Sequence, residues 1–168
     1  MAEQIVRGFD RVQAVVIGLI RQLRPVGLDE LGLAAALEHC VDEWRRRLPQ
    51  LALELAVSAP LEQLDEMRRL ALYRLVQEGL TNVARHSHAT RVAIRIDREP
   101  GGARRPAAHI VAAIEDNGVG VDPAAPAVGL GLIGMRERVE AVGGTLLMRT
   151  SSAGGFALCA HLPLGSAA

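Results

Sequence analysis

The sequence predicts an α/β fold in which helices cover one face of a sheet, that is, a two-layer α/β sandwich. Two observations lead to this prediction. Segments with helical hydrophobic spacing alternate with short strand-like segments, in the order helix, helix, strand, helix, strand, strand, helix, strand, strand. In addition, 49% of the 168 residues are hydrophobic, which is enough apolar surface for the core of about one ordinary domain.

The first helical segment is predicted to lie outside the globular domain. Its apolar residues are spaced by four and three positions, as in a helix that packs against a partner helix: Ile5, Phe9, Val12, Val16, Leu19 and Leu23. Pro25 and Gly27 then interrupt the pattern. We therefore divide the chain into a partial dimerisation helix and linker at 1–27 and a domain at 28–168.

The remaining elements follow from local patterns. Helical segments are expected at 28–48 and at 60–85, with Pro60 in the first turn of the longer one. A third helix is expected at 132–142, ended by Gly143, a residue suited to a left-handed cap. Alternating or continuous apolar residues predict strands, which fall at 51–57, 92–96, 110–114, 145–150 and 156–162.

Charge and cysteine content exclude several functions. The 19 basic and 19 acidic residues cancel, so we expect no direct nucleic-acid binding. Every basic residue is arginine, which excludes chemistry that needs a lysine amine. Cys40 and Cys159 lack metal-ligand spacing, so we expect two buried, reduced thiols. With no window long and apolar enough for a membrane span, we expect a soluble, cytoplasmic chain.

One polar set lies on a single stripe of the long helix. Glu78 and Asn82 are four residues apart, and Arg85 and His86 follow about one turn later. A carboxylate, an amide oxygen and cationic groups on one face suit a magnesium ion that bridges phosphates. The same pattern is also typical of an ordinary solvated helix face.

A second set follows directly on the strand that ends near Glu115. Here Asp116 is followed by Gly118 and Gly120, which would let the backbone approach a flat ligand while the carboxylate accepts from an exocyclic amine. A plain turn at the end of a strand would look the same.

A third set is the glycine series at Gly129, Gly131 and Gly134, which includes Leu130 and Leu132 and opens the last predicted helix. Free backbone amides at the start of a helix bind phosphate well. A dinucleotide-binding unit is excluded, because the residues before the glycines are not a strand and no βαβ unit surrounds them.

Together these three sets resemble the ATP-binding domain of sensor histidine kinases. The segments LYRLVQEGLTNVARHS, IEDNGVGVD and GLGLIGMRERVEAVGGTL resemble that family's three nucleotide-binding boxes. The segment LRPVGLDELGLAAAL resembles the linker of the nitrate- and desiccation-sensor subfamily, whose partners are NarL-type regulators. The likeness runs from about residue 23 to residue 164 and implies the two-layer fold shared with gyrase, mismatch-repair and heat-shock chaperone ATPases.

The resemblance implies a role for each residue. Asn82 would ligate Mg²⁺, Glu78 would act as a base or hold the attacking geometry and contact the metal through water, and Asp116 would read the adenine of ATP. Gly118 and Gly120 would shape the adenine site, while Arg85 and His86 would lie near the phosphates. The segment 129–134 (Gly129, Leu130, Gly131, Leu132, Gly134) would close over the phosphates, with a short lid at 121–128.

Two departures from the family qualify this expectation. The family often places Thr after a glycine pair near the C-terminus, where this chain has Phe156 after Gly154 and Gly155, and this predicts weaker nucleotide binding. The acceptor-histidine motif of the subfamily is also missing, so the histidines at 39, 86, 88, 109 and 161 are interpreted as part of the catalytic domain.

The missing motif bears on activity and on partners. We expect a protein-histidine kinase domain that cannot autophosphorylate alone, with a homodimer formed through the N-terminal helix and a DNA-binding response regulator as partner. A full-length protein anchored upstream in a membrane would fit the same pattern. Two alternatives stay open: a non-catalytic ATP-binding regulatory module, and an anti-sigma-factor-type kinase of the same superfamily.

Overall fold

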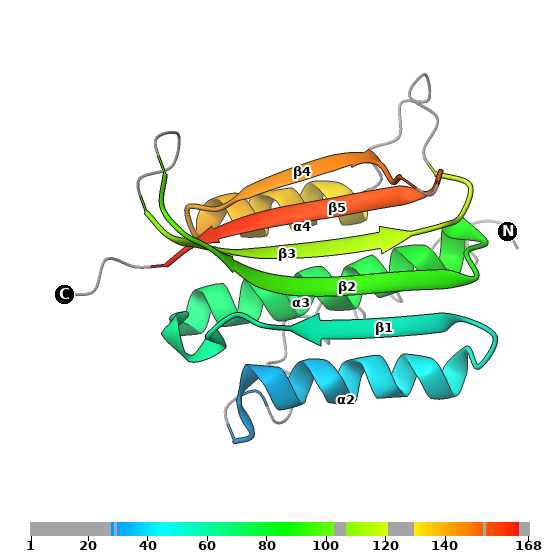
Figure 1. The fold of residues 1–168 in the computed structure, drawn as a ribbon, viewed down its shortest axis with the longest axis horizontal. Helices are drawn as coiled ribbons and strands as arrows, with labels where there is room; N and C mark the ends of the chain where they lie inside the picture. Colours follow the sequence, from blue (N-terminus) through cyan, green and yellow to red (C-terminus); the bar gives the residue numbers. More distant parts are fainter. Residues whose placement is uncertain (1–27, 29, 103–106, 121–129, 153, 165–168) are drawn as a thin grey trace, which may run out of the picture.

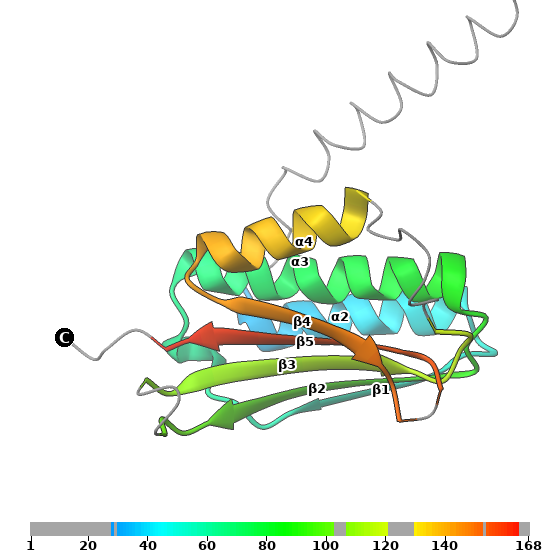
Figure 2. The same ribbon diagram turned by 90° about the horizontal axis from the view of Figure 1, so that it is seen from above.

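A computed structural model describes residues 28, 30–102, 107–120, 130–152 and 154–164 of the chain. The predicted arm and linker at 1–27 and the lid at 121–128 lie outside these residues. Within them, three α-helices lie on one side of a five-stranded sheet with the strand order β1-β2-β3-β5-β4. Figure 2 shows the helices and the sheet as two separate layers, so the predicted sandwich is confirmed.

The sheet is mixed. β1 (Ala52–Val57) pairs in parallel with β2 (Arg91–Glu99), whereas the other neighbours are antiparallel: β2 with β3 (His109–Asp116), β3 with β5 (Phe156–Pro163), and β4 (Thr145–Thr150) with β5. All five predicted strands are present, and each begins or ends within three residues of its expected bounds. A parallel pair requires a crossover connection, and the long helix between β1 and β2 provides it.

The helix-covered face of the sheet follows from strict alternation in β3. Ile110, Ala112 and Ile114 are buried, while the residues between them are only half-buried. Because side chains alternate between the two faces of a strand, Asp116 falls on the same face as Ile114. The strand pattern therefore carries a carboxylate into the layer between sheet and helices.

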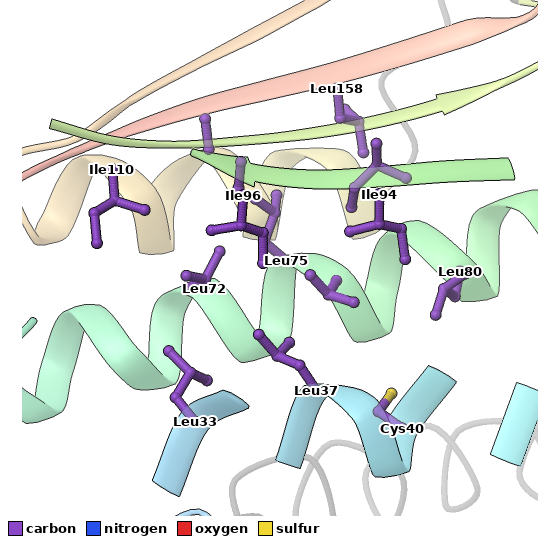
Figure 3. Close-up of a cluster of buried hydrophobic side chains, with 14 of the residues drawn as sticks. Leu33, Leu37, Cys40, Leu72, Leu75, Leu80, Ile94, Ile96, Ile110 and Leu158 are labelled. Atoms are coloured by element: carbon purple, nitrogen blue, oxygen red, sulfur yellow. The ribbon is translucent and has the colours of Figure 1, made fainter. Parts of the chain in front are cut away.

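The core lies between the sheet and helices α2 (Gly32–Arg47) and α3 (Glu66–Asn82). Figure 3 shows leucines of both helices pointing toward isoleucines of β2 and β3; Leu37, Leu72, Ile94, Ile96 and Ile110 are at most 1% exposed. Burying each such side chain contributes roughly 1.5–3 kcal/mol. Cys40 on α2 lies in this core beside Tyr73 of α3, and burial raises the pKa of the Cys40 thiol.

The bounds predicted for the long helix, 60–85, are wrong at both ends. Residues 60–65 do not begin it: Leu61–Gln63 form a 3₁₀ turn, and the helix starts at Glu66, where the Asp65 side chain accepts a hydrogen bond from the Arg68 amide (2.8 Å). An Asp at this N-cap position is a stronger start signal than the proline that we used. At the other end, Val83–Ser87 form a π-helical turn that finishes at His88 with φ 51°.

The last helix, α4 (Leu130–Ala141), is antiparallel to α3 in Figure 1 and starts two residues earlier than predicted. Gly143 has φ +75°, the left-handed conformation that the sequence predicted at its end. The same early start means that Gly131, and not only Gly134, lies inside the helix. None of the helices among the described residues combines the length and apolar character needed to cross a membrane.

Candidate functional site

The site is built around the buried carboxylate of Asp116, which is 5% exposed. Its Oδ1 accepts hydrogen bonds from the backbone amides of Gly118 (2.8 Å) and Phe156 (3.3 Å). Among the described residues no donor is recorded on Oδ2. A buried carboxylate needs donors for its remaining lone pairs, so Oδ2 is an acceptor position for a ligand that carries an N–H group.

Two glycines make this arrangement possible. A Cβ on Gly155 would lie 2.2 Å from the Asp116 carbonyl oxygen and 2.5 Å from Oδ1. A Cβ on Gly118 would lie 2.0 Å from the carbonyl oxygen of Ser87. Since both obstacles include backbone, no side-chain movement could relieve the clash, and glycine is required at both positions.

Three polar residues that the sequence analysis did not single out hold the surrounding loops, two through their side chains and one through its backbone carbonyl. Asn117 accepts from the amides of Thr90 (3.0 Å) and Arg91 (2.9 Å), which fixes the loop after β3 to the start of β2. The Ser87 carbonyl oxygen accepts from the Val119 amide (2.9 Å). The Ser151 hydroxyl donates to the Asp116 carbonyl oxygen (2.7 Å). Asn directly after a strand is a turn signal that could have identified the first of them.

Ser151 also explains how the chain manages without the expected threonine. The Phe156 side chain offers no hydroxyl, but its backbone amide reaches Asp116 Oδ1, and Ser151 Oγ accepts from the Gly155 amide (3.2 Å) while it holds the Asp116 carbonyl. The loop before β5 is thereby tied to the end of β3. The geometry of Asp116 therefore does not depend on a hydroxyl at position 156.

A further glycine brings helix α3 close to the sheet beside this carboxylate. A Cβ on Gly79 would lie 2.7 Å from the Cδ1 atom of Ile114, two residues before Asp116. Glu78 and Asn82 lie on α3 next to Gly79. The close approach of α3 to β3 at this glycine therefore places both side chains at the end of the sheet where Asp116 lies. In Figures 1 and 2 this is the end at which β3 and α3 both finish.

Glu78 and Asn82 face the first turn of α4. A Cβ on Gly131 would lie 2.7 Å from Glu78 Oε1 and 3.9 Å from Asn82 Oδ1. The Asn82 side-chain nitrogen is buried, and it has no hydrogen-bond partner among the described residues. An orphaned buried amide costs about 1–3 kcal/mol, which indicates a position that a ligand or its bound water completes.

The chemistry of these donors fits a hard cation held mainly by phosphate and water. No group of three His, Cys, Asp or Glu side chains within the described ranges could hold a metal ion by itself. An amide oxygen, a nearby carboxylate and the first turn of a helix suit Mg²⁺, because this ion usually keeps several waters and binds one or two protein ligands plus substrate phosphates.

The other predicted residues are less closely connected. Gly120 has φ +69°, and a Cβ there would lie 2.9 Å from the Gly154 carbonyl oxygen. Arg85 and His86 are exposed on the π-helical turn beyond Asn82. Leu132 is half-buried against the core, and Gly134 faces the Arg138 side chain of its own helix. Gly129 and the Leu130 side chain lie outside the described part of the structure.

The chain is similar in sequence to a known ATPase family and to sensor kinases. Residues 67–166 match the family "Histidine kinase-, DNA gyrase B-, and HSP90-like ATPase". The signal transduction histidine-protein kinase/phosphatase UhpB of Salmonella typhimurium is 35% identical over 128 residues, which are 76% of this chain and 24% of that protein. The kinase/phosphatase DegS of Brevibacillus brevis is 31% identical over 152 residues, 90% of this chain and 37% of DegS.

Among solved structures, the ATP-binding domain of PrrB from Mycobacterium tuberculosis is similar. Its TM-score is 0.57 at 27% identity, and the match covers 77% of this chain and 92% of that domain. The chain thus spans about a quarter to a third of the two curated relatives above, but corresponds to nearly all of the solved domain.

Proposed function

The chain belongs to the histidine kinase-, DNA gyrase B- and HSP90-like ATPase family, and from this premise we propose that it binds Mg²⁺-ATP and donates the γ-phosphoryl group to a histidine on a dimerisation helix outside this chain. The observation that carries the proposal is the pairing at one end of the sheet. Among the described residues, a buried carboxylate with no donor on one oxygen lies there beside a helix that bears a buried amide nitrogen without a partner.

The purine half of the proposal rests on Asp116. With Oδ1 held by two backbone amides, Oδ2 would accept a hydrogen bond from the exocyclic amine of adenine. Guanine has a carbonyl oxygen at that position, so it would face the carboxylate with an acceptor and be rejected. Gly118 and Gly120 would line the flat base, since larger residues there meet neighbouring backbone.

The phosphate half rests on α3 and on the first turn of α4. Asn82 would ligate Mg²⁺ directly and Glu78 through water, and the ion would neutralise charge on the phosphates. The backbone of residues 129–134 would lie over the phosphates, with Arg85 and His86 as nearby cationic groups. Glu78 would also orient or deprotonate the attacking histidine, because it faces the same space as Asn82.

The proposed partners are those of the related sensor kinases. UhpB and DegS are named as signal transduction histidine-protein kinases, so we infer a two-component role with a DNA-binding response regulator as the final phosphoryl acceptor. We also infer a homodimer formed through residues 1–27 and a cytoplasmic location for this domain.

Nucleotide binding is tested by isothermal titration calorimetry of the chain with ATP and with GTP, each with Mg²⁺ present and absent. We expect heat with ATP, weaker binding without Mg²⁺, and none with GTP. Absence of heat with Mg²⁺-ATP would overturn the proposal.

Phosphoryl transfer is tested separately by mixing the chain with labelled ATP and a fragment that carries the acceptor helix of a related kinase. We expect label on the histidine of that fragment, no label on the chain incubated alone, and no transfer in Asn82→Ala. Tight binding without transfer would instead support a non-catalytic regulatory module.

A further inference from the structure

A second cluster of reactive side chains lies on the opposite face of the sheet. Cys159 and His161 are two residues apart on β5, and their Sγ and Nε2 atoms are 3.6 Å apart. The Nδ1 atom of the same ring lies 3.2 Å from Oε2 of Glu99, at the end of β2. We propose that Cys159, His161 and Glu99 form a thiol modification site that accepts a low-molecular-weight disulfide.

The order of the three groups fixes their roles. A carboxylate can only accept, so the Nδ1 atom that faces Glu99 carries the proton. In the neutral ring Nε2 is then unprotonated, and it faces the Cys159 sulfur as a base. A nucleophile whose base is in turn oriented by a third group is the arrangement that activates a thiol.

The position on the sheet gives a small molecule access. Cys159 is only half-buried, in contrast to the prediction that both thiols are buried, because alternate residues of β5 point away from the helices. Its partners across the strands are Ala113 and Leu147, the latter 48% exposed. In Figures 1 and 2 no described element covers this face.

The chain contains its own comparison in Cys40. That thiol is 4% exposed in the helix-covered core, its hydrogen-bond partner is Tyr73, and burial raises its pKa. A buried thiol with a raised pKa is inert toward disulfides. The two cysteines therefore differ in exposure and in the nearby base, while the rest of the protein is shared.

The proposed step is a thiol–disulfide exchange. The proton of the Cys159 thiol moves to His161 Nε2, and the thiolate attacks one sulfur of the small disulfide. A new disulfide forms between Cys159 and that sulfur, and the original sulfur–sulfur bond breaks. The leaving thiolate takes the proton from the imidazolium, so Cys159 is oxidised and one half of the small disulfide is reduced to a thiol.

The experiment treats the native chain with oxidised glutathione and follows the mixed disulfide on each cysteine by peptide mass spectrometry. We expect Cys159 to be modified and Cys40 to stay unmodified. His161→Asn should slow the reaction at neutral pH roughly tenfold, because the variant lacks the base that takes the thiol proton. His109→Asn is the matched control: the His109 ring packs edge-on against His161 with the ring centroids 6.4 Å apart, and its partner across the strands is Pro163 rather than Cys159.

A pH profile of the rate separates activation from simple exposure. In the native chain the rate should reach its plateau at a pH below about 8.5, the pKa of an ordinary cysteine thiol. Glu99→Gln should shift the profile toward higher pH. The other groups on this face that act on the profile are Arg95 and Asp97 of β2, His109 and Glu115 of β3, and Arg149 of β4, which pairs with Glu115.

Two results would contradict the proposed thiol modification site. Equal rates in the native chain and in folded His161→Asn, or a native profile that rises only near pH 8.5, would overturn it. If a variant does not fold, the native profile and the difference between the two cysteines still decide. Mg²⁺-ATP binding should be unchanged in Cys159→Ser, so failure here is independent of the proposed kinase function.

Discussion

The candidate nucleotide site has two halves, a purine half around Asp116 and a phosphate half around Glu78 and Asn82. They differ in how many of their polar groups are already hydrogen-bonded without a ligand. Around Asp116, hydrogen bonds from Gly118, Phe156 and Ser151 fix both the carboxylate and the backbone that carries it. Around Asn82, the side-chain nitrogen is buried without a partner in the part of the chain that the structure describes. The purine half is thus preorganised, which lowers the ordering cost of binding, whereas the phosphate half requires its ligand to satisfy it.

The largest effect is expected where the preorganised half is broken. Gly118→Ala places a Cβ 2.0 Å from the Ser87 carbonyl oxygen, so the loop after β3 and the π-helical turn must separate. We expect a loss of about 2–4 kcal/mol in the free energy of unfolding and no measurable ATP binding. Urea denaturation and calorimetry measure the two quantities.

Gly102→Ala is the matched control, because nothing lies within 4 Å of a Cβ at that position. It should change the free energy of unfolding by less than about 0.5 kcal/mol. If Gly118→Ala behaved like Gly102→Ala, the close contact between the two loops would not exist in solution.

A smaller effect on stability but a clear effect on binding is expected for Asp116→Asn. The amide oxygen can still accept from the Gly118 and Phe156 amides, but the amide nitrogen then occupies the position that faces the adenine amine. Two donors would face each other, and loss of a hydrogen bond to a charged group should raise the Kd for ATP roughly tenfold to 150-fold. Asp97→Asn, exposed on β2, should leave the Kd unchanged.

A substitution at Asn82, in the phosphate half of the site, should raise the free energy of unfolding, whereas the substitutions around Asp116 lower it. Asn82→Leu removes the orphaned amide and keeps a side chain of similar size, so the free energy of unfolding without ligand should rise by about 1 kcal/mol. The same variant should lose the Mg²⁺-dependent part of ATP binding. A destabilised Asn82→Leu would show that the amide has a partner, and the contrast between the halves would fail.

The sequence predicted the parts of this architecture that depend on local patterns. The strands were found because apolar residues alternate, and β3 in particular placed Asp116 at its end. The predicted start of α3 is wrong because Pro60 and Asp65 are competing start signals, and the helix begins after the Asp65 cap. An Asp before a helical segment is itself a local signal, so this start is predictable from the sequence.

What the sequence did not predict depends on contacts between distant segments. Asn117, Ser87 and Ser151 contribute through partners that are 26 to 35 residues away, and no spacing rule specifies those pairs. Glu99 reaches His161 across 62 residues for the same reason. The exposure of Cys159, by contrast, could have been predicted from the sequence. The apolar residues Leu158, Ala160 and Leu162 alternate along β5 and are buried, so Cys159 between them points to the other face.

The smallest expected effect tests how adaptable the phosphate half is. Gly131→Ala places a Cβ 2.7 Å from Glu78 Oε1, but this obstacle is the end of a flexible side chain rather than backbone. Alanine also favours a helix over glycine by about 1 kcal/mol, so the free energy of unfolding should stay the same or rise slightly. Displacement of the Glu78 carboxylate should reduce phosphoryl transfer to the acceptor-helix fragment by more than it weakens ATP binding. A loss of stability comparable to that of Gly118→Ala would mean that the first turn of α4 is as rigidly held as the Asp116 loop, and the difference between the two halves would disappear.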